Sequence, residues 1–230
     1  MRILAIDTST DWLSVAAGDG AMWHARQERA GSANSERLLP AVHAVLAEAQ
    51  WRLADLDGIA FGAGPGAFTG VRIACSVAQG LAFGIDRPVV AISTLAALSQ
   101  SAWRERGCAR VVACLDARMR EIYLAAYVRE NDGWRTVQEP VVVKPDDAPF
   151  PDGADWQGEG DGFAAYPALA DHAGLRGTNP AAIPTARAVG ELALPQFAAN
   201  LGVPAAEARP LYVRHRVALT TAERAAGARL

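Results

Sequence analysis

The chain has 230 residues, of which 51% are hydrophobic and 20% charged, so it is long enough to bury a substantial core. Its formal net charge of −3 argues against a protein that holds nucleic acid through positive charge spread over its whole surface. The cysteines are three, Cys75, Cys108 and Cys114, with no C-x-x-C pair, which argues against a disulfide framework and favours a reducing environment.

The first half of the chain is predicted to place three strands before its helices. Gly18-Asp19-Gly20 between two β-rich runs is a strong hairpin signal. Ser35 is expected to cap the first helix, in which Pro40 falls near the first turn, where proline is tolerated. The predicted strands are residues 2–10, 12–18, 21–29, 56–62 and 89–92, and the predicted helices are residues 35–50, 71–83 and 94–103.

The second half restarts with three β-rich runs, so the same order of elements occurs twice. Strand-rich openings followed by helices favour an α/β fold with mixed sheets over an all-parallel sheet. We predict two lobes, residues 1–103 and 104–230, with a tail beyond about residue 220 that is loose or returns to the first lobe. The second lobe is expected to hold strands at 110–116, 121–129, 134–143 and about 156–158, a surface loop at 145–155, a helix at 185–194 and an extended segment at 209–214.

An aspartate ends the first strand of each half, Asp7 in one and Asp116 in the other. Because the halves share one order, we expect both at a cleft between the lobes, where they could coordinate a magnesium–nucleotide complex or act as bases. Thr8 and Ser9 follow Asp7 and are small enough to let backbone amides reach phosphates. The bulky Arg118 near Asp116 disfavours a phosphate clamp, so the interpretation that both aspartates hold turns through local hydrogen bonds is favoured.

A dense charge cluster follows Asp116 and comprises Arg118, Arg120 and Glu121. Such a run is usually a solvated face. Its position matches residues 8–11 of the first half, which places it at the predicted cleft. Arg118 and Glu121 are therefore candidates for ligand contacts.

The loop from Gly62 to Gly70 is the sharpest local signature. Gly64 and Gly66 flank a proline, and Thr69 is expected to cap the helix that follows. Backbone amides at a helix start can hold an anion. The loop is not a P-loop, since no Lys-Ser/Thr pair follows the glycines. A tight strand-to-helix turn that lets the helix pack closely is favoured over anion binding.

The two long helices of the first half are apolar over more than one face. A surface helix should show a single apolar stripe, and helices apolar nearly all round are buried on two sides. One sheet can cover only one side, so we expect a partner subunit or a second copy of the chain on the other; the alternative is that small alanines tolerate exposure. The predicted partner interface comprises Leu38, Leu39, Val42, Leu46, Val71, Ala74, Val77, Ala78 and Leu81.

Neither a metal site nor an autonomous catalyst is indicated. The histidines, His24, His43, His172 and His215, are isolated, and no G-x-S-x-G elbow is present. The sequence shows no signal peptide and no uncharged apolar run long enough to span a bilayer. We expect a cytoplasmic chain with no membrane contact, no metal and no catalytic residue of its own.

With these motifs in their order, the chain resembles the bacterial TsaB (YeaZ) family. The resemblance runs from residue 1 to about 215, and the glycine loop together with the Asp-Ala-Arg cluster makes it specific. Three positions depart from the family pattern, Ala67 for serine, Asn34 for histidine and Ala74 for glycine, and the missing hydroxyl weakens a ligand contact at Ala67. The matching motifs are residues 4–9, 35–40, 64–73, 116–123 and 210–214.

The resemblance implies the duplicated actin/Hsp70/sugar-kinase-like (ribonuclease H-like) fold and the role of an accessory subunit. In the family, TsaB pairs with TsaD, its catalytic paralogue, through the two apolar helices, and self-associates as a homodimer through the same surface. A TsaE-type ATPase joins the pair, and the complex uses ATP and magnesium. The pair forms N6-threonylcarbamoyladenosine at position 37 of tRNAs that read ANN codons, so tRNA is expected to bind through the complex.

Other functions stay open at this stage. The chain could act alone as an ATP-dependent phosphotransferase of the same fold, which a sensitive nucleotide titration would reveal. A peptidase role lacks a nucleophile or metal site. Direct tRNA binding by a basic C-terminal stretch would give a steep salt dependence, and its arginines are Arg209, Arg214, Arg216, Arg224 and Arg229.

Overall fold

The computed structural model describes residues 1–131 and 133–213. The predictions on the tail beyond residue 220, and on the arginines from Arg214 onward, lie outside the described residues.

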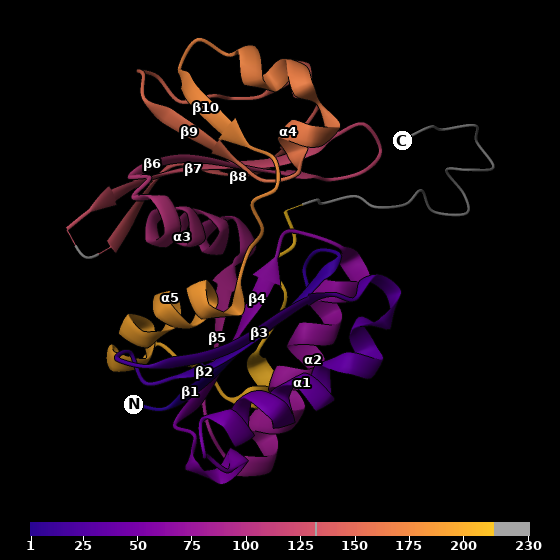
Figure 1. The fold of residues 1–230 in the computed structure, drawn as a ribbon, viewed down its shortest axis with the longest axis vertical. Helices are drawn as coiled ribbons and strands as arrows, with labels where there is room; N and C mark the ends of the chain where they lie inside the picture. Colours follow the sequence, from indigo (N-terminus) through magenta and orange to yellow (C-terminus); the bar gives the residue numbers. More distant parts are fainter. Residues whose placement is uncertain (132, 214–230) are drawn as a thin grey trace.

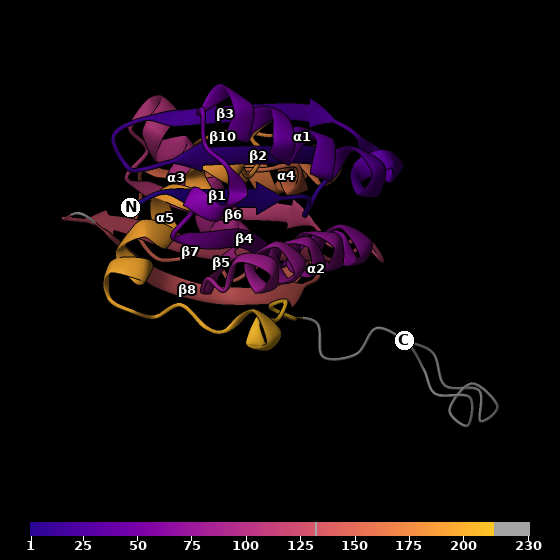
Figure 2. The ribbon, with the colours of Figure 1, turned by 90° about the horizontal axis from the view of Figure 1, so that it is seen from below.

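The first lobe is built on a mixed five-stranded sheet of order β3-β2-β1-β4-β5. β1 (Ile3–Asp7), β2 (Trp12–Gly18) and β3 (Trp23–Arg29) form an antiparallel meander, and β4 (Gly58–Gly64) and β5 (Val89–Ser93) run parallel to β1. The helices α1 (Asn34–Glu48) and α2 (Phe68–Ile85) cover one face (Figure 1 and Figure 2). The predicted βββαβαβα order is confirmed.

The second sheet has the order β10-β9-β6-β7-β8, which is the same order read from the other edge. Its meander is β6 (Arg110–Asp116), β7 (Ile122–Glu130) and β8 (Gly133–Val143), and β9 (Trp156–Glu159) and β10 (Leu175–Asn179) are parallel to β6. α3 (Thr94–Arg106) packs on one face and the short α4 (Gly162–Ala165) on the other. Two sheets of one topology confirm the duplicated actin/Hsp70/sugar-kinase-like (ribonuclease H-like) fold.

The central strand β1 is buried on both faces, which explains its continuous apolar run. Leu4 and Ile6 face the core under α1 and α2, whereas Ile3 and Ala5 face a second core under α5 (Ala186–Ala198). This alternation follows from the two-residue period of a strand.

α5 was expected in the second lobe, and it packs on the first sheet instead. The backbone N–H of Ala186 donates to Ser14 Oγ at 2.8 Å, which fixes the start of α5 on β2. α3 and α5 lie between the two sheets (Figure 1). The physical reason is that both faces of β1 are apolar, so the first sheet needs a helix on each side. The chain after residue 185 supplies the second one.

Two predicted helix caps are wrong. α1 begins at Asn34 and follows a 3₁₀ turn at Gly31–Ala33, so Ser35 lies inside its first turn and makes no cap. α2 begins at Phe68 with Ala67 in the cap position and no side-chain cap, so Thr69 is also inside the helix. In both helices the backbone is already helical at the residue before Ser35 or Thr69, so neither side chain stands at the cap position.

By length and composition, α2 could cross a membrane, and it is the one such helix among residues 1–131 and 133–213. The sequence had been expected to contain no such run. Ala74, Ala78 and Ala82 on α2 are buried against the first sheet, and a core helix passes the same test of length and composition.

Candidate functional site

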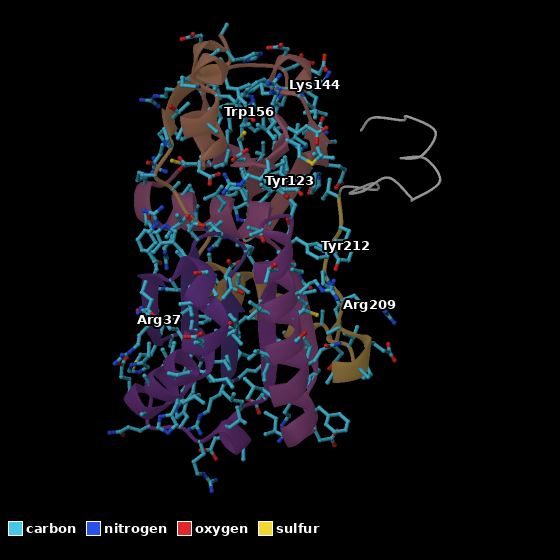
Figure 3. All side chains as sticks on the ribbon, turned by 90° about the vertical axis from the view of Figure 1, so that its right-hand side faces the viewer. Arg37, Tyr123, Lys144, Trp156, Arg209 and Tyr212 are labelled. Atoms are coloured by element: carbon cyan, nitrogen blue, oxygen red, sulfur yellow. The ribbon has the colours of Figure 1, made fainter. Side chains whose placement is uncertain are left out.

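A cleft of about 870 Å³ opens between the two lobes, as predicted from the duplicated order. Figure 3 shows Tyr123 of the second lobe above Tyr212, which belongs to the segment that runs along α2. The cleft is lined by Ser9, Thr10, Asp11, Trp12, Arg29, Pro65, Gly66, Ala67, Phe68, Val71, Leu115, Asp116, Ala117, Arg118, Tyr123, Asp161, Pro180, Ala181, Ala182, Ile183, Leu211, Tyr212 and Val213.

The predicted site residues divide into two groups. Ser9, Gly66, Asp116 and Arg118 line the cleft, whereas Asp7, Thr8, Gly64, Thr69 and Glu121 do not. The sequence reading missed the aromatic lining residues and Asp161. The signal for Asp161 was available, because it is an acidic residue just beyond the end of the strand β9.

Asp7 is buried beside the glycine loop instead of facing the cleft. Its side chain accepts hydrogen bonds through Oδ1 from the Ser9 backbone N–H at 2.9 Å and from Ser9 Oγ–H at 2.7 Å. Oδ2 has no hydrogen-bond partner among the described residues, and a Cβ on Gly62 would collide with it. Burial raises the pKa of Asp7 to about 6, against the opposing effect of the Ser9 hydrogen bonds. Asp7 therefore holds a turn, as the favoured interpretation has it.

The glycine loop packs directly on the chain that follows β1. The Ala67 N–H donates to the Ser9 carbonyl at 2.7 Å, and Thr8 Oγ1 donates to the Gly70 carbonyl at 2.7 Å. A Cβ on Gly66 would overlap Ser9, and one on Gly70 would overlap the Thr8 carbonyl. These contacts support the tight strand-to-helix turn, because the loop packs closely on Thr8 and Ser9.

The charges of the cleft are mostly paired. Arg29 contacts Asp11 at 3.3 Å, and Arg118 Nη1 contacts Asp116 Oδ2 at 3.0 Å. Asp116 also accepts from the Arg118 backbone N–H at 2.9 Å, while its own N–H donates to Asp161 Oδ1 at 3.0 Å. Both aspartates at strand ends thus organise turns. In the described part of the chain, no group of three His, Cys, Asp or Glu side chains converges as a metal site would require.

The residues of the predicted partner interface differ in how far their own lobe buries them. Leu38, Val42, Leu46, Ala74 and Ala78 point into the first core, whereas Val71 lines the cleft, and each of these side chains is at most 7% exposed. Leu39 is 52% exposed, and Val77 and Leu81 are half-buried. The five side chains of the core are covered by the sheet of their own lobe and cannot reach a partner on the outer side of the helices.

The fold and cleft define a two-lobed protein of the actin/Hsp70/sugar-kinase class, with the first-lobe aspartate sealed under a glycine loop. A family model described as TsaD, tRNA N6-adenosine threonylcarbamoyltransferase, matches residues 27–167. The chain is 38% identical to the tRNA threonylcarbamoyladenosine biosynthesis protein TsaB of Escherichia coli (strain K12), over 95% of this chain and 96% of that protein. The TsaB of Haemophilus influenzae is 37% identical, over 94% and 95% of the two chains.

A solved structure of YeaZ from Pseudomonas aeruginosa is 40% identical and superposes with a TM-score of 0.86, covering 92% of this chain and 99% of that one. The chain therefore belongs to the TsaB (YeaZ) family of tRNA threonylcarbamoyladenosine biosynthesis proteins, which is related to TsaD.

Proposed function

We propose that this chain is the accessory subunit that pairs with and activates a TsaD-type transferase. The pair forms N6-threonylcarbamoyladenosine at position 37 of ANN-decoding tRNAs in the cytoplasm. A TsaE-type ATPase joins it and brings the use of ATP and magnesium, and in the absence of its partner the chain self-associates through the same surface. The observation that carries the proposal is an uncovered helix face on the first lobe.

This helix face consists of the outward side chains of α1 and α2. Leu39 on α1 is 52% exposed, and the half-buried Val77 and Leu81 lie one turn apart on α2. Phe83, which is 79% exposed, lies farther round α2. Exposed large apolar side chains gathered on one surface mark interaction sites. The helix face is therefore suited to burial against another subunit.

Two glycines strengthen this assignment. Gly80 and Gly84 lie on the exposed side of α2, and a Cβ at either position would meet nothing within 4 Å. Glycine in a helix interior costs about 1 kcal/mol relative to alanine, and no contact among the described residues requires it here. Close approach of a second backbone to α2 would account for both glycines.

The cleft supports an accessory role for the chain. Asp7 is sealed from the cleft, and Asp116 is engaged with Arg118 and the β6–β7 turn. Neither carboxylate is held ready for a magnesium–nucleotide complex. The chemistry of the transfer would then belong to the partner.

Replacing Leu39 by glutamate is expected to abolish both the complex and the modified adenosine. A carboxylate in an apolar interface loses its hydration without gaining a partner. The measurement is reconstitution from purified TsaD-type, TsaE-type and synthase proteins, with mass spectrometry of tRNA nucleosides. Leu201→Glu is the matched control, since Leu201 is 64% exposed outside both helices. Product formed equally well without this chain would contradict the proposal.

Replacing Gly80 by leucine should leave the free chain at least as stable, because leucine is the better helix former by somewhat under 1 kcal/mol. The same side chain blocks close helix approach, so we expect affinity for the TsaD-type partner to fall at least tenfold. Urea unfolding and calorimetric titration measure the two effects. Glu105→Leu, at an exposed position of α3, is the control, and an equal loss of affinity there would refute the role of Gly80.

A further inference from the structure

The mouth of the cleft carries exposed aromatic side chains that the helix face does not include. Phe68 at the start of α2 and Tyr212 of the C-terminal segment are 53% and 58% exposed. Their ring centroids lie 6.3 Å apart with an interplanar angle of 32°. Leu211 between Tyr212 and the sheet is 44% exposed. Together they form an apolar lip on the first lobe, which we call the aromatic lip.

Hydrogen bonds to its backbone fix the segment that carries Leu211 and Tyr212 of the aromatic lip. The Leu211 N–H donates to the Ala63 carbonyl at 2.7 Å, and Gln79 Nε2 donates to the Ala208 carbonyl at 3.0 Å. The segment therefore runs fixed along α2, as Figure 3 shows for the stretch that carries Arg209 and Tyr212. Rings held in advance lose little conformational entropy when a planar ligand stacks on them.

Arginines stand on both sides of the mouth. The guanidinium of Arg72 lies 5.0 Å from the Phe68 ring centroid. On the opposite side, the β6–β7 turn exposes Arg118 and Arg120 with φ values of 60° each, and Met119 between them has φ 55°. Three successive non-glycine residues in the left-handed region are strained, and such strain gathers at binding sites.

The lining of the cleft and the rim of its mouth carry charges of different sign. Asp11, Asp116 and Asp161 line the cleft, and two of them already pair with Arg29 and Arg118. Both arginines of the lining are therefore already engaged with carboxylates, and the lining holds one more aspartate than arginine. Arg72 and Arg120 lie outside the lining and make no ion pair within the described residues. Aromatic faces next to rim arginines match the chemistry of an unpaired nucleotide within a strand, whose base stacks while its phosphates stay outside.

We propose that the cleft mouth binds unpaired nucleotides of RNA, with bases stacked on Phe68 and Tyr212 and backbone phosphates at Arg72 and Arg120. This inference rests on the proposed function, because tRNA is the substrate of the complex. It places an RNA contact on this chain itself, on residues separate from the helix face.

The test is binding of a fluorescein-labelled anticodon stem-loop RNA to the full chain, alone and with its TsaD-type partner, followed by fluorescence anisotropy. Phe68→Ala and Tyr212→Ala should each weaken binding about tenfold, whereas Tyr212→Phe retains it. Arg72→Gln should lower the slope of log affinity against log salt by about one. Leu201→Ala removes a side chain that is 64% exposed and lies outside both the aromatic lip and the helix face, so it should leave the affinity unchanged.

Unchanged affinity in both alanine variants, with and without the partner, would overturn the RNA site. Equal binding of a fully paired duplex would also overturn it, since stacking requires unpaired bases. Displacement of the RNA by ATP at equal concentration would assign the site to free nucleotides instead. Leu39→Glu separates the two proposals, because it should abolish pairing with the transferase and leave RNA binding by the isolated chain intact.

Discussion

Replacing Arg106 by alanine is expected to lower the free energy of unfolding by about 3 kcal/mol. Arg106, at the end of α3, forms an ion pair with Glu159 of β9, whose side chain is fully buried. Removing one partner of a buried pair leaves an uncompensated charge, at a cost of about 3–5 kcal/mol. The lower end applies, because the Arg106 side chain is 36% exposed. Urea unfolding at pH 8 measures the loss.

The pH dependence of this loss identifies its cause. Burial raises the pKa of Glu159, and Arg106 opposes that rise. Without Arg106 the pKa of Glu159 rises further. The variant therefore loses most stability at pH values where Glu159 would be ionised in the unfolded chain. The loss should therefore shrink as the pH falls from 8 to 5. Arg106→Ala combined with Glu159→Gln should recover most of the stability, and a loss independent of pH would point to packing alone.

Replacing Asp7 by asparagine is expected to raise the free energy of unfolding at pH 7 by about 3 kcal/mol. The pKa of Asp7 rises from 3.8 to about 6 on folding, and each unit corresponds to about 1.4 kcal/mol. The native state binds the proton more tightly, so Asp7 lowers stability as the pH rises from about 4 to 6. Asparagine keeps the acceptor for Ser9 and carries no charge.

The slope of stability against pH provides the sharper measurement. Between pH 4 and 6 the natural chain should lose stability through Asp7, and Asp7→Asn should remove that contribution. Asp116→Asn is the matched control, because Asp116 occupies the equivalent strand end in the second sheet and its side chain is 17% exposed. An unchanged slope in Asp7→Asn would show that the Asp7 carboxyl does not titrate in this range.

α2 connects the two proposed surfaces. Its first turn carries Phe68 and Arg72 at the cleft mouth, and its last turns carry Gly80, Phe83 and Gly84 on the helix face. Variants at the two ends of one helix can therefore separate RNA binding from subunit pairing.

Local patterns predicted most of the elements and the duplicated order. The continuous apolar run of β1 and the alternation of β2 are properties of a few neighbouring residues, so they can be read without long-range information. The predicted caps at Ser35 and Thr69 are wrong because both helices begin earlier. Their cap positions are held by Ala33 and Ala67, whose side chains cannot accept a hydrogen bond. The apolar character of the two long helices was read from the sequence, but the exposed Gly80 and Gly84 were missed, since glycine carries no hydropathy signal.

The amino-acid sequence by itself determined the two halves, their α/β order, the cleft between them and the family to which the chain belongs. Its residue types also identified Asp7 and Asp116 as equivalent strand ends. Only the tertiary structure decided that Asp7 is sealed beside Gly62, that α5 returns to the first sheet and that Phe68 meets Tyr212. These contacts join residues far apart in the chain, and their geometry depends on how two sheets and their helices pack together. Local sequence periodicity carries no information about such packing.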